Sequence, residues 1–335
     1  MRNVKSLFVG ALVLGLAAVS PAGATFPGKN GLLVFSGVDT NSASVQIFRI
    51  AGDGSGGLTR LTPVVGGVWN ESPSWSADAK LIYFDVFDMN AGTTRIYRMD
   101  ANGGSRTLSD STTPAAHVFP SVDRTGTRVA AVEFGASGSA SLIRQRPDGS
   151  DRVLVAAGSD QVSNFSPQYA PDGPRILFNQ VTFASGGGIQ SSDIVIANNG
   201  KHLKTITQRT DDQFSSPSWA PDAKTILAVR DLPQSDQIVR MTPGGTNIVV
   251  LLTVPSAEGF VASPTFSPDG KKIAFERCTP KNPQAGGDCG DPANPSALGS
   301  LWVMNADGSN PVKILDQTTT GVQPDMSSLS WGVGQ

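Results

Sequence analysis

The sequence predicts an all-β protein, a six-bladed β-propeller built from four-stranded antiparallel blades. Three observations predict this fold: a composition that favours turns, a motif that recurs about every 47 residues, and two further strand signals after each motif. Of the 335 residues, 37 are Gly and 23 are Pro, and 24 of the 28 acidic residues are Asp. Because Asp, Gly and Pro favour turns whereas Glu favours helices, the composition excludes a mostly helical fold.

The motif consists of Pro, a polar residue, an aromatic residue or Val, and a turn rich in Asp, Pro and Gly. It occupies residues 73–78, 120–126, 167–173, 217–222 and 264–270. Its third position falls at Trp75, Val122, Tyr169, Trp219 and Phe266, with spacings of 47, 47, 50 and 47. An apolar run follows each copy, which predicts two strands joined by a tight turn. So regular a period predicts stacked equivalent units.

A second pair of strand signals follows within each unit. The third strands are predicted at 47–50, 96–99, 142–144, 194–196, 238–241 and 301–304. Turns such as Asp53-Gly54 and Asp307-Gly308 follow them. The fourth strands are predicted at 58–62, 106–109, 152–155, 203–207, 248–253 and 312–315. Four antiparallel strands in each unit of 47 to 50 residues are typical of one propeller blade.

Weaker motif copies at the two ends predict how the ring closes. Phe26 lies 49 residues before Trp75, and Trp331 lies 65 residues after Phe266. The last copy supplies an innermost strand without successors, and the first supplies three strands without a predecessor, so we expect both ends to share one blade. The longer last interval predicts an insertion at 278–299. We expect the aromatic motif residues to form the core between blades; these are Trp75, Tyr169, Trp219, Phe266 and Trp331.

Residues 1–24 have the features of a Sec-type signal peptide. Positive charges precede an apolar run at 7–20, and Ala22-Gly23-Ala24 fits the cleavage pattern. The propeller is then expected at 25–335, in an exported protein that is periplasmic or secreted. The apolar run is shorter than the roughly 20 residues of a membrane span, so we expect no stable membrane insertion after cleavage. In an oxidising compartment, Cys278 and Cys289 are expected to form a disulfide.

Two segments of the last unit resemble a known repeat. Ser-Pro-Asp-Gly-Lys-Lys-Ile-Ala-Phe at 267–275 and Leu-Trp-Val-Met-Asn-Ala-Asp-Gly at 301–308 are similar to the repeat of the TolB-type six-bladed β-propellers. The resemblance extends over nearly all of residues 25–335. It implies the propeller fold and a tendency to bind proteins. We expect this propeller to lack the separate N-terminal α/β domain of the TolB protein.

Catalytic motifs are absent from the sequence. It contains no Gly-x-Ser-x-Gly, no phosphate-binding loop ending in Gly-Lys-Ser or Gly-Lys-Thr, and no His-Glu-x-x-His. The only imidazole groups belong to His117 and His202. His117 lies on a connection expected near the central channel and is a candidate binding residue, whereas His202 is expected at a solvated strand end. The sequence therefore favours a protein that is not an enzyme and has no catalytic residue.

The strand order predicts two different faces of the ring. The Pro-Asp-Gly and Asp-Gly turns share one face, which we call the turn face, because successive strands alternate in direction. The longer connections between second and third strands, and those between blades, share the opposite loop face, where function usually concentrates. The loop face is predicted to be acidic. Its candidate binding residues, besides His117, are Asp85, Asp88, Asp211, Asp212, Asp231 and Asp236.

The partner expected for this face is a protein. The formal net charge is −2, and no stretch concentrates Lys and Arg, which excludes nucleic acid as the expected partner. We expect a monomer without a cofactor or a metal, although the acidic face leaves Ca²⁺ as an alternative. The alternative function is an enzyme or ligand binder directed at a sugar or lactone, with a divalent ion in the central channel.

Overall fold

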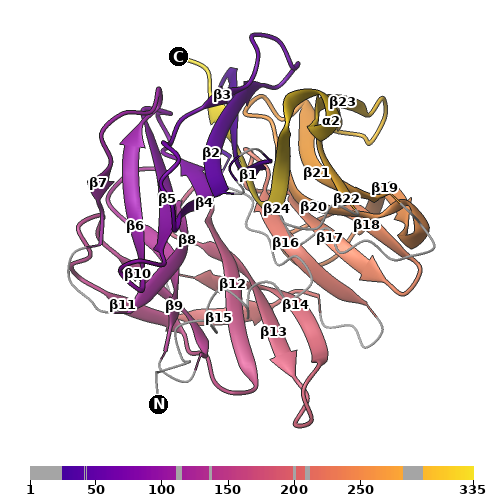
Figure 1. The fold of residues 1–335 in the computed structure, drawn as a ribbon. Helices are drawn as coiled ribbons and strands as arrows, with labels where there is room; N and C mark the ends of the chain where they lie inside the picture. The colour runs from indigo at the N-terminus through magenta and orange to yellow at the C-terminus, as the bar shows by residue number, and fades with distance from the viewer. Residues whose placement is uncertain are drawn as a thin grey trace.

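The computed structural model describes residues 25–40, 42, 44–110, 115–135, 138–198, 201–207, 212–281 and 297–335. These residues form six antiparallel four-stranded sheets arranged in a ring (Figure 1). The all-β fold and the six four-stranded blades predicted from the repeat are confirmed.

The four strands of a blade follow one another from the innermost position outward. Blade 1 is β24 (Val322–Val333), β1 (Asn30–Asp39), β2 (Ser44–Ala51) and β3 (Thr59–Arg60). Blade 2 is β4 (Val68–Trp75), β5 (Leu81–Asp88), β6 (Thr93–Asp100) and β7 (Thr107–Leu108). Blade 3 is β8 (Ala116–Val122), β9 (Val129–Phe134), β10 (Ala140–Gln145) and β11 (Val153–Ala156).

The second half of the ring repeats this order. Blade 4 is β12 (Val162–Tyr169), β13 (Ile176–Phe183), β14 (Ile189–Asn198) and β15 (His202–Thr205). Blade 5 is β16 (Gln213–Trp219), β17 (Ile226–Leu232), β18 (Ser235–Met241) and β19 (Val249–Pro255). Blade 6 is β20 (Phe260–Phe266), β21 (Lys272–Pro280), β22 (Ala297–Asn305) and β23 (Val312–Asp316). Two short helical turns, η2 (Ser256–Glu258) and α2 (Gln317–Thr320), precede β20 and β24.

Strands from both ends of the chain close the ring in blade 1. β24 pairs with β1 in antiparallel register, with Trp331 opposite Leu33 and Leu329 opposite Phe35. β24 also packs against the innermost strands of both neighbouring blades, β4 and β20. The shared blade predicted from the terminal motif copies is therefore confirmed, and the ring has no open edge.

Each innermost strand contains a β-bulge, which lies next to the motif Pro in five blades and at Met326 in β24, whose motif copy has no Pro. The registers of all six strands shift there. One non-glycine residue in each bulge adopts a left-handed conformation, with φ between 49° and 61°; these residues are Ser72, Phe119, Ser166, Ser216, Ser263 and Met326. This conformation costs free energy in a non-glycine residue, so the surrounding structure must hold it in place.

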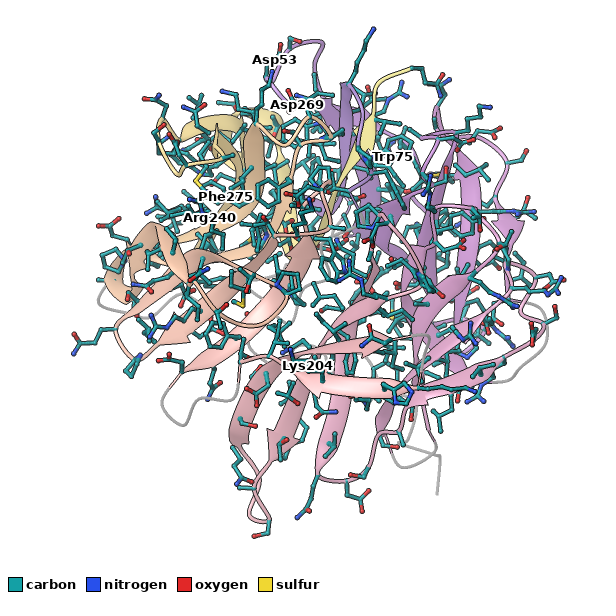
Figure 2. All side chains as sticks on the ribbon, turned by 180° about the vertical axis from the view of Figure 1, so that it is seen from behind. Asp53, Trp75, Lys204, Arg240, Asp269 and Phe275 are labelled. Carbon is teal, nitrogen blue, oxygen red and sulfur yellow. The ribbon has the colours of Figure 1, made fainter. Side chains whose placement is uncertain are left out.

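The motif aromatics lie between neighbouring blades. Trp219 is fully buried and packs among Leu177 and Ile194 of blade 4 and Ile226 of blade 5. The other four are also buried; they are Trp75, Tyr169, Phe266 and Trp331. Figure 2 shows Trp75 set among the strands, whereas Asp53 projects from the tip of its turn. Sheets covered on both faces explain why the second strands are apolar in consecutive positions.

Turns between third and fourth strands rest on the outer strand of the preceding blade. Gly245 is an example: its φ is 75°, and a Cβ there would lie 1.8 Å from the carbonyl oxygen of Ile206. Gly187 also has a positive φ, 85°, but has nothing within 4 Å of a Cβ. Both glycines therefore have a positive φ that disfavours other residues, but only Gly245 lies against the backbone of a neighbouring blade.

Replacing Gly245 with Ala should lower the free energy of unfolding by about 1–3 kcal/mol more than replacing Gly187, because only Gly245 lacks room for a methyl group. Both changes introduce the same strain of a left-handed non-glycine residue. Chemical denaturation of the two variants measures the difference. Equal losses would show that the turn does not rest on blade 4 as described.

The predicted insertion at 278–299 begins and ends inside paired strands. Cys278 lies opposite Gly299, and Pro280 lies opposite Ala297. Residues 282–296 and Cys289 lie outside the described residues, so the disulfide stays a prediction, as does the signal peptide at 1–24. In the described part of the chain, no helix is long and apolar enough to span a membrane.

Candidate functional site

Buried polar side chains on the loop-face half of the innermost strands link adjacent blades. Asn70, His117 and Asn164 occupy equivalent positions, each two residues before the left-handed residue of its strand. All three are fully buried. Asn70 donates to the Oε1 atom of Gln46 in blade 1 at 3.1 Å, and Asn164 donates to the Ala140 carbonyl of blade 3 at 3.2 Å. His117 therefore occupies a position that blades 2 and 4 fill with a structural amide.

Both ring nitrogens of His117 contact carboxylates. Its Nδ1 atom is hydrogen bonded to Asp110, on the connection from blade 2, and its Nε2 atom lies 3.0 Å from Glu133 on β9. Burial lowers the pKa of His117, but hydrogen bonds and charge from Asp110 and Glu133 outweigh burial and raise it above 6.5. With both ring nitrogens hydrogen bonded to carboxylates, His117 has no free nitrogen for a metal or for proton transfer to a substrate.

Arg152 completes this network from the start of the outer strand. Its Nε atom donates to Glu133 Oε2 at 2.7 Å, and its Nη2 atom donates to Oε1. Although burial raises the pKa of Glu133, Arg152 and His117 hold it below its usual range. The chain Asp110–His117–Glu133–Arg152 thus ties the connection between blades 2 and 3 to three strands of blade 3.

Asp85 stabilises the bulge of the next blade. The Oδ1 atom of Asp85 accepts from the backbone N–H of Phe119 at 3.0 Å. Glu276 occupies the equivalent position of blade 6 and is also buried. Because Phe119 is a left-handed residue, the bond from Asp85 helps to hold the bulge of the neighbouring blade in place.

Burial and neighbouring acids raise the pKa of Asp85 and of two further carboxyl groups. Burial raises that of Asp85 to about 6, and the charge of Asp325 adds to it, while the Phe119 amide and Ser72 oppose the shift. Burial raises the pKa of Glu276 well above its usual range, and the charge of Asp325 adds a smaller effect. Burial also raises the pKa of Glu71 well above its usual range, and the charges of Asp85 and Asp325 add to this shift. These four acids therefore lie near one another and cannot all be ionised at neutral pH.

A second acidic pair lies on the hairpin of blade 5. Asp231 and Asp236 lie directly opposite each other on β17 and β18. Burial, then the charge of Asp236, raises the pKa of Asp231 to about 7, and burial raises that of Asp236 to about 6. The Ser215 hydroxyl donates to Asp231 at 3.2 Å, and the Val261 amide donates to Asp236 at 3.3 Å.

The remaining described candidates, Asp212 and Asp88, lie in blades 5 and 2. Asp212 forms an ion pair with Arg230 at 2.7 Å. Asp88 lies on the turn after β5, where its Oδ1 atom accepts from the Asn90 and Ala91 amides at 2.9 and 3.1 Å. Asp211 lies outside the described residues. The six described candidates therefore lie in blades 2, 3 and 5, and their role in binding stays a prediction.

Replacing Asp231 with Asn should raise the free energy of unfolding by about 1–3 kcal/mol near pH 8 and leave it unchanged below about pH 4. A carboxyl group whose folded pKa is raised binds its proton more tightly in the folded state, so it destabilises the fold as pH rises through about 4 to 7. Asn removes that cost and keeps an acceptor for Ser215. Thermal unfolding across pH measures the difference.

Asp316 provides a control of opposite sign. Hydrogen bonds from Lys313 and Thr318 lower its pKa to about 2. Asp316→Asn should therefore destabilise the protein at neutral pH, with a difference that shrinks as pH falls towards about 2. Destabilisation by Asp231→Asn near pH 8 would contradict the assignment of a buried, charge-disfavouring environment.

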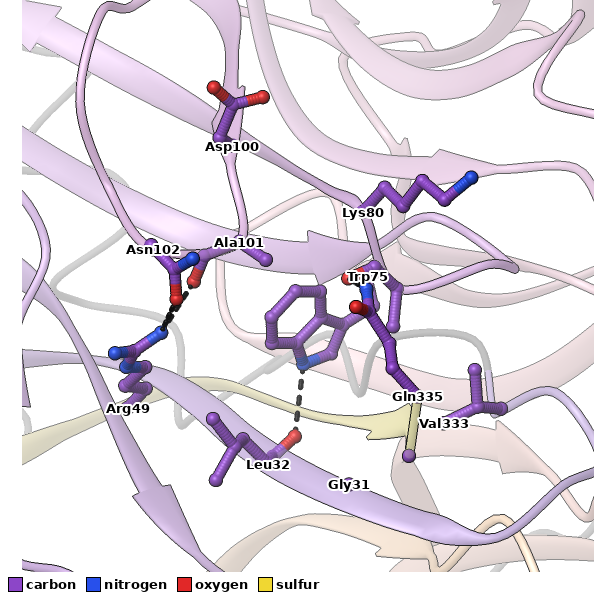
Figure 3. A pocket seen from close by; sticks show the side chains of 12 residues that line it. Gly31, Leu32, Arg49, Trp75, Lys80, Asp100, Ala101, Asn102, Val333 and Gln335 are labelled. Atoms are coloured by element: carbon purple, nitrogen blue, oxygen red, sulfur yellow. Dashed lines mark hydrogen bonds between the residues drawn. The ribbon is translucent and has the colours of Figure 1, made fainter.

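Two grooves on the turn face lie between adjacent blades. One, of about 380 Å³, includes Arg49 and Trp75 between blades 1 and 2 (Figure 3). Arg49 donates to the Ala101 carbonyl at 2.9 Å and to Asn102 at 2.7 Å, and the Trp75 indole donates to the Leu32 carbonyl at 3.1 Å. The other groove, of about 440 Å³, contains Arg240 between blades 5 and 6. None of the candidate residues lies in either groove.

Sequence reasoning missed Glu133, Glu276, Asp325, Arg152 and Asn70. The sequence could have indicated Glu276, because Glu276 and Asp85 interrupt the apolar second strands of their blades at equivalent positions. The partners of His117 gave none, because Asp110, Glu133 and Arg152 meet only when the strands of blade 3 pair.

The arrangement does not supply a metal site among the described residues. No three His, Cys, Asp or Glu side chains there come together in a way that could hold an ion. Of the four clustered acids, Asp85 already accepts from a backbone amide. The Ca²⁺ alternative stays a prediction.

No known protein family and no curated protein sequence matches the chain. Among solved structures, TolB from Acinetobacter baumannii is similar with a TM-score of 0.68 and 17% identity, over 92% of this chain and 68% of that one. A chain of the nidogen–laminin complex has a TM-score of 0.65 and 11% identity, over 91% and 100%. Oligogalacturonate lyase from Vibrio parahaemolyticus has a TM-score of 0.56 and 11% identity, over 90% and 79%. At these identities the likeness shows the fold alone.

Proposed function

We propose that this TolB-like six-bladed propeller is an exported, non-enzymatic scaffold that binds a protein partner through its loop face. One observation carries the proposal: ionisable groups buried on that face form contacts that hold the blades together. In His117, for example, both ring nitrogens contact carboxylates. A rigid ring that displays connections of different lengths suits recognition rather than catalysis. The propellers of TolB and of the nidogen–laminin complex support this proposal by analogy.

Affinity capture from cell-envelope extracts tests the proposal. The wild-type protein should retain a specific protein, and Asp88→Lys on the loop face should abolish that capture. Asp222→Lys on the turn face is a matched control, because Asp222 also accepts from the amide two residues later, at 2.8 Å. It should leave capture unchanged. Capture of no protein by the wild type, or equal capture by both variants, would contradict the proposal.

The proximity of the acids Glu71, Asp85, Glu276 and Asp325 motivates a second candidate, a propeller directed at a sugar or lactone with a divalent ion in the channel, although no three of them are arranged to hold an ion in this structure. The fold of oligogalacturonate lyase is consistent with this candidate. Elemental analysis of the purified protein separates the two. A stoichiometric divalent metal, with a thermal shift on adding sugars, would favour the second candidate over the first.

A further inference from the structure

We propose that an apolar cluster on the loop-face end of blade 2 is the docking site for a polypeptide segment that carries apolar side chains flanked by Lys or Arg. The apolar cluster consists of Val64, Val65, Trp69, Phe87 and Met89. The inference rests on the proposed function and gives it a site and a partner chemistry.

Two turns bring the cluster together. The connection entering blade 2 makes a tight turn in which Val65 and Val68 pair across Gly66 and Gly67. The turn between β5 and β6 lies beside it, because the Met89 amide donates to the Gly67 carbonyl at 2.8 Å. The Asn90 side chain also donates to the Gly66 carbonyl at 2.9 Å. The apolar residues of the two turns are therefore held on one rigid platform.

An aromatic pair lies on the two strands that border these turns. Trp69 on β4 lies directly opposite Phe87 on β5, with ring centroids 5.9 Å apart and an edge-on angle of 65°. Both rings are partly exposed. Val64, Val65 and Met89 are 40%, 42% and 48% exposed. Trp, Phe and Met are enriched in the cores of protein interfaces, where few residues supply most of the binding free energy.

The other exposed large apolar residues of the described chain are distributed differently. They lie on the outermost strands β7, β11, β15, β19 and β23, with one or two on each; they are Leu108, Leu154, Leu203, Val249, Val250 and Val312. Scattered exposed residues of this kind are ordinary, whereas adjacent ones mark an interaction surface. On the loop face, the described residues place adjacent exposed apolar side chains at the cluster in blade 2.

Charge selects the partner. The loop-face half of β4 and β5 carries Glu71, Asp85 and Asp88, whereas Lys80 lies in the turn on the opposite face. The nearby Arg95, on β6 opposite Val86, donates to the Asp110 carbonyl at 3.3 Å. Asp88 is held by its turn amides next to Met89, and it forms no ion pair with any described residue. A basic side chain beside the apolar anchors would complement this carboxylate, whereas an acidic one would be repelled.

Short synthetic peptides test both parts of the inference by fluorescence anisotropy. One peptide combines Leu and Phe with Lys, a second replaces Lys with Glu, and a third combines Lys with Ser. The first should bind most tightly. Val65→Ser and Met89→Ser should each weaken its binding about tenfold, as expected for interface anchors. Asp88→Asn, which keeps an acceptor for the turn, should weaken binding and reduce its dependence on salt.

Leu203→Ser is the matched control, because Leu203 is 47% exposed on β15 of blade 4. It should change binding of the first peptide less than about twofold. Equal binding of the Glu peptide, or a loss in Met89→Ser no larger than in Leu203→Ser, would overturn the inference. Circular dichroism melts establish that the variants are folded. If Met89→Ser still captured the partner from extracts, this site would be wrong while protein binding stood; failure of wild-type capture would instead contradict the proposed function.

Discussion

Replacing His117 with Leu is expected to lower the free energy of unfolding by about 3–5 kcal/mol at neutral pH, the cost of removing one member of a buried charged network. Leu leaves the fully buried Asp110 without its hydrogen-bonded partner and deprives Glu133 of one of its two. Because the pKa of His117 is raised, its stabilising effect is complete below about pH 6.5 and is lost as pH rises through the folded value. Urea denaturation at several pH values measures this loss.

His117→Asn is the informative control. Asn fills the equivalent position in blades 2 and 4, so it should be tolerated better than Leu. It should also remove the dependence of stability on pH that the imidazolium introduces. A surface-like effect of His117→Leu, below about 1 kcal/mol, would contradict a structural role for this network.

Replacing Trp219 with Ala is expected to lower the free energy of unfolding by about 3–5 kcal/mol, the usual cost of deleting a large buried side chain. Trp219 is fully buried between blades 4 and 5, and the Arg175 guanidinium lies 4.5 Å from its ring. The substitution therefore opens a cavity in the interface that holds two blades together. Denaturant unfolding followed by circular dichroism measures the loss.

Trp302 provides a comparison of the same side chain in a more exposed place. It lies partly exposed on β22, where it stacks on Phe275 with ring centroids 6.4 Å apart. Trp302→Ala should cost less than Trp219→Ala, because less apolar surface is removed from contact. An equal or larger loss for Trp302 would place the motif aromatics outside the blade interfaces and contradict the alignment of the repeat.

The repeat predicted the ring because local turn chemistry and strand pattern agree in nearly every blade. Spacings between motif aromatics such as Trp75 and Tyr169 correspond to whole blades. The bulges could not be predicted in this way. Residues before Pro normally avoid the helical regions of backbone space, yet Ser72 and Phe119 adopt φ of 53° and 56° there. Contacts from the neighbouring blade, such as that of Asp85 with Phe119, determine this conformation.

The acidic loop face was predicted from the charges of the side chains alone, without knowledge of the groups that surround them in the fold. Asp85 and Asp231 were candidates because connections lie beside them, but both accept hydrogen bonds within the fold. Asp212 is neutralised by Arg230, a residue 18 positions away that only strand pairing brings near. Asp88 remains as an acid without a basic partner among the described residues. Its two contacts are to amides of its own turn, which the local sequence could suggest.

Nitrogen NMR of the His117 imidazole tests most directly whether the buried ionisable groups of the loop face serve the structure. With two histidines in the chain, the signals can be assigned by comparison with His117→Asn. A ring with both nitrogens protonated at neutral pH, and a titration midpoint above 6.5, is the predicted result. A neutral ring at neutral pH, with one nitrogen unprotonated and exchanging with added ligand, would contradict it and restore His117 as a candidate catalytic base.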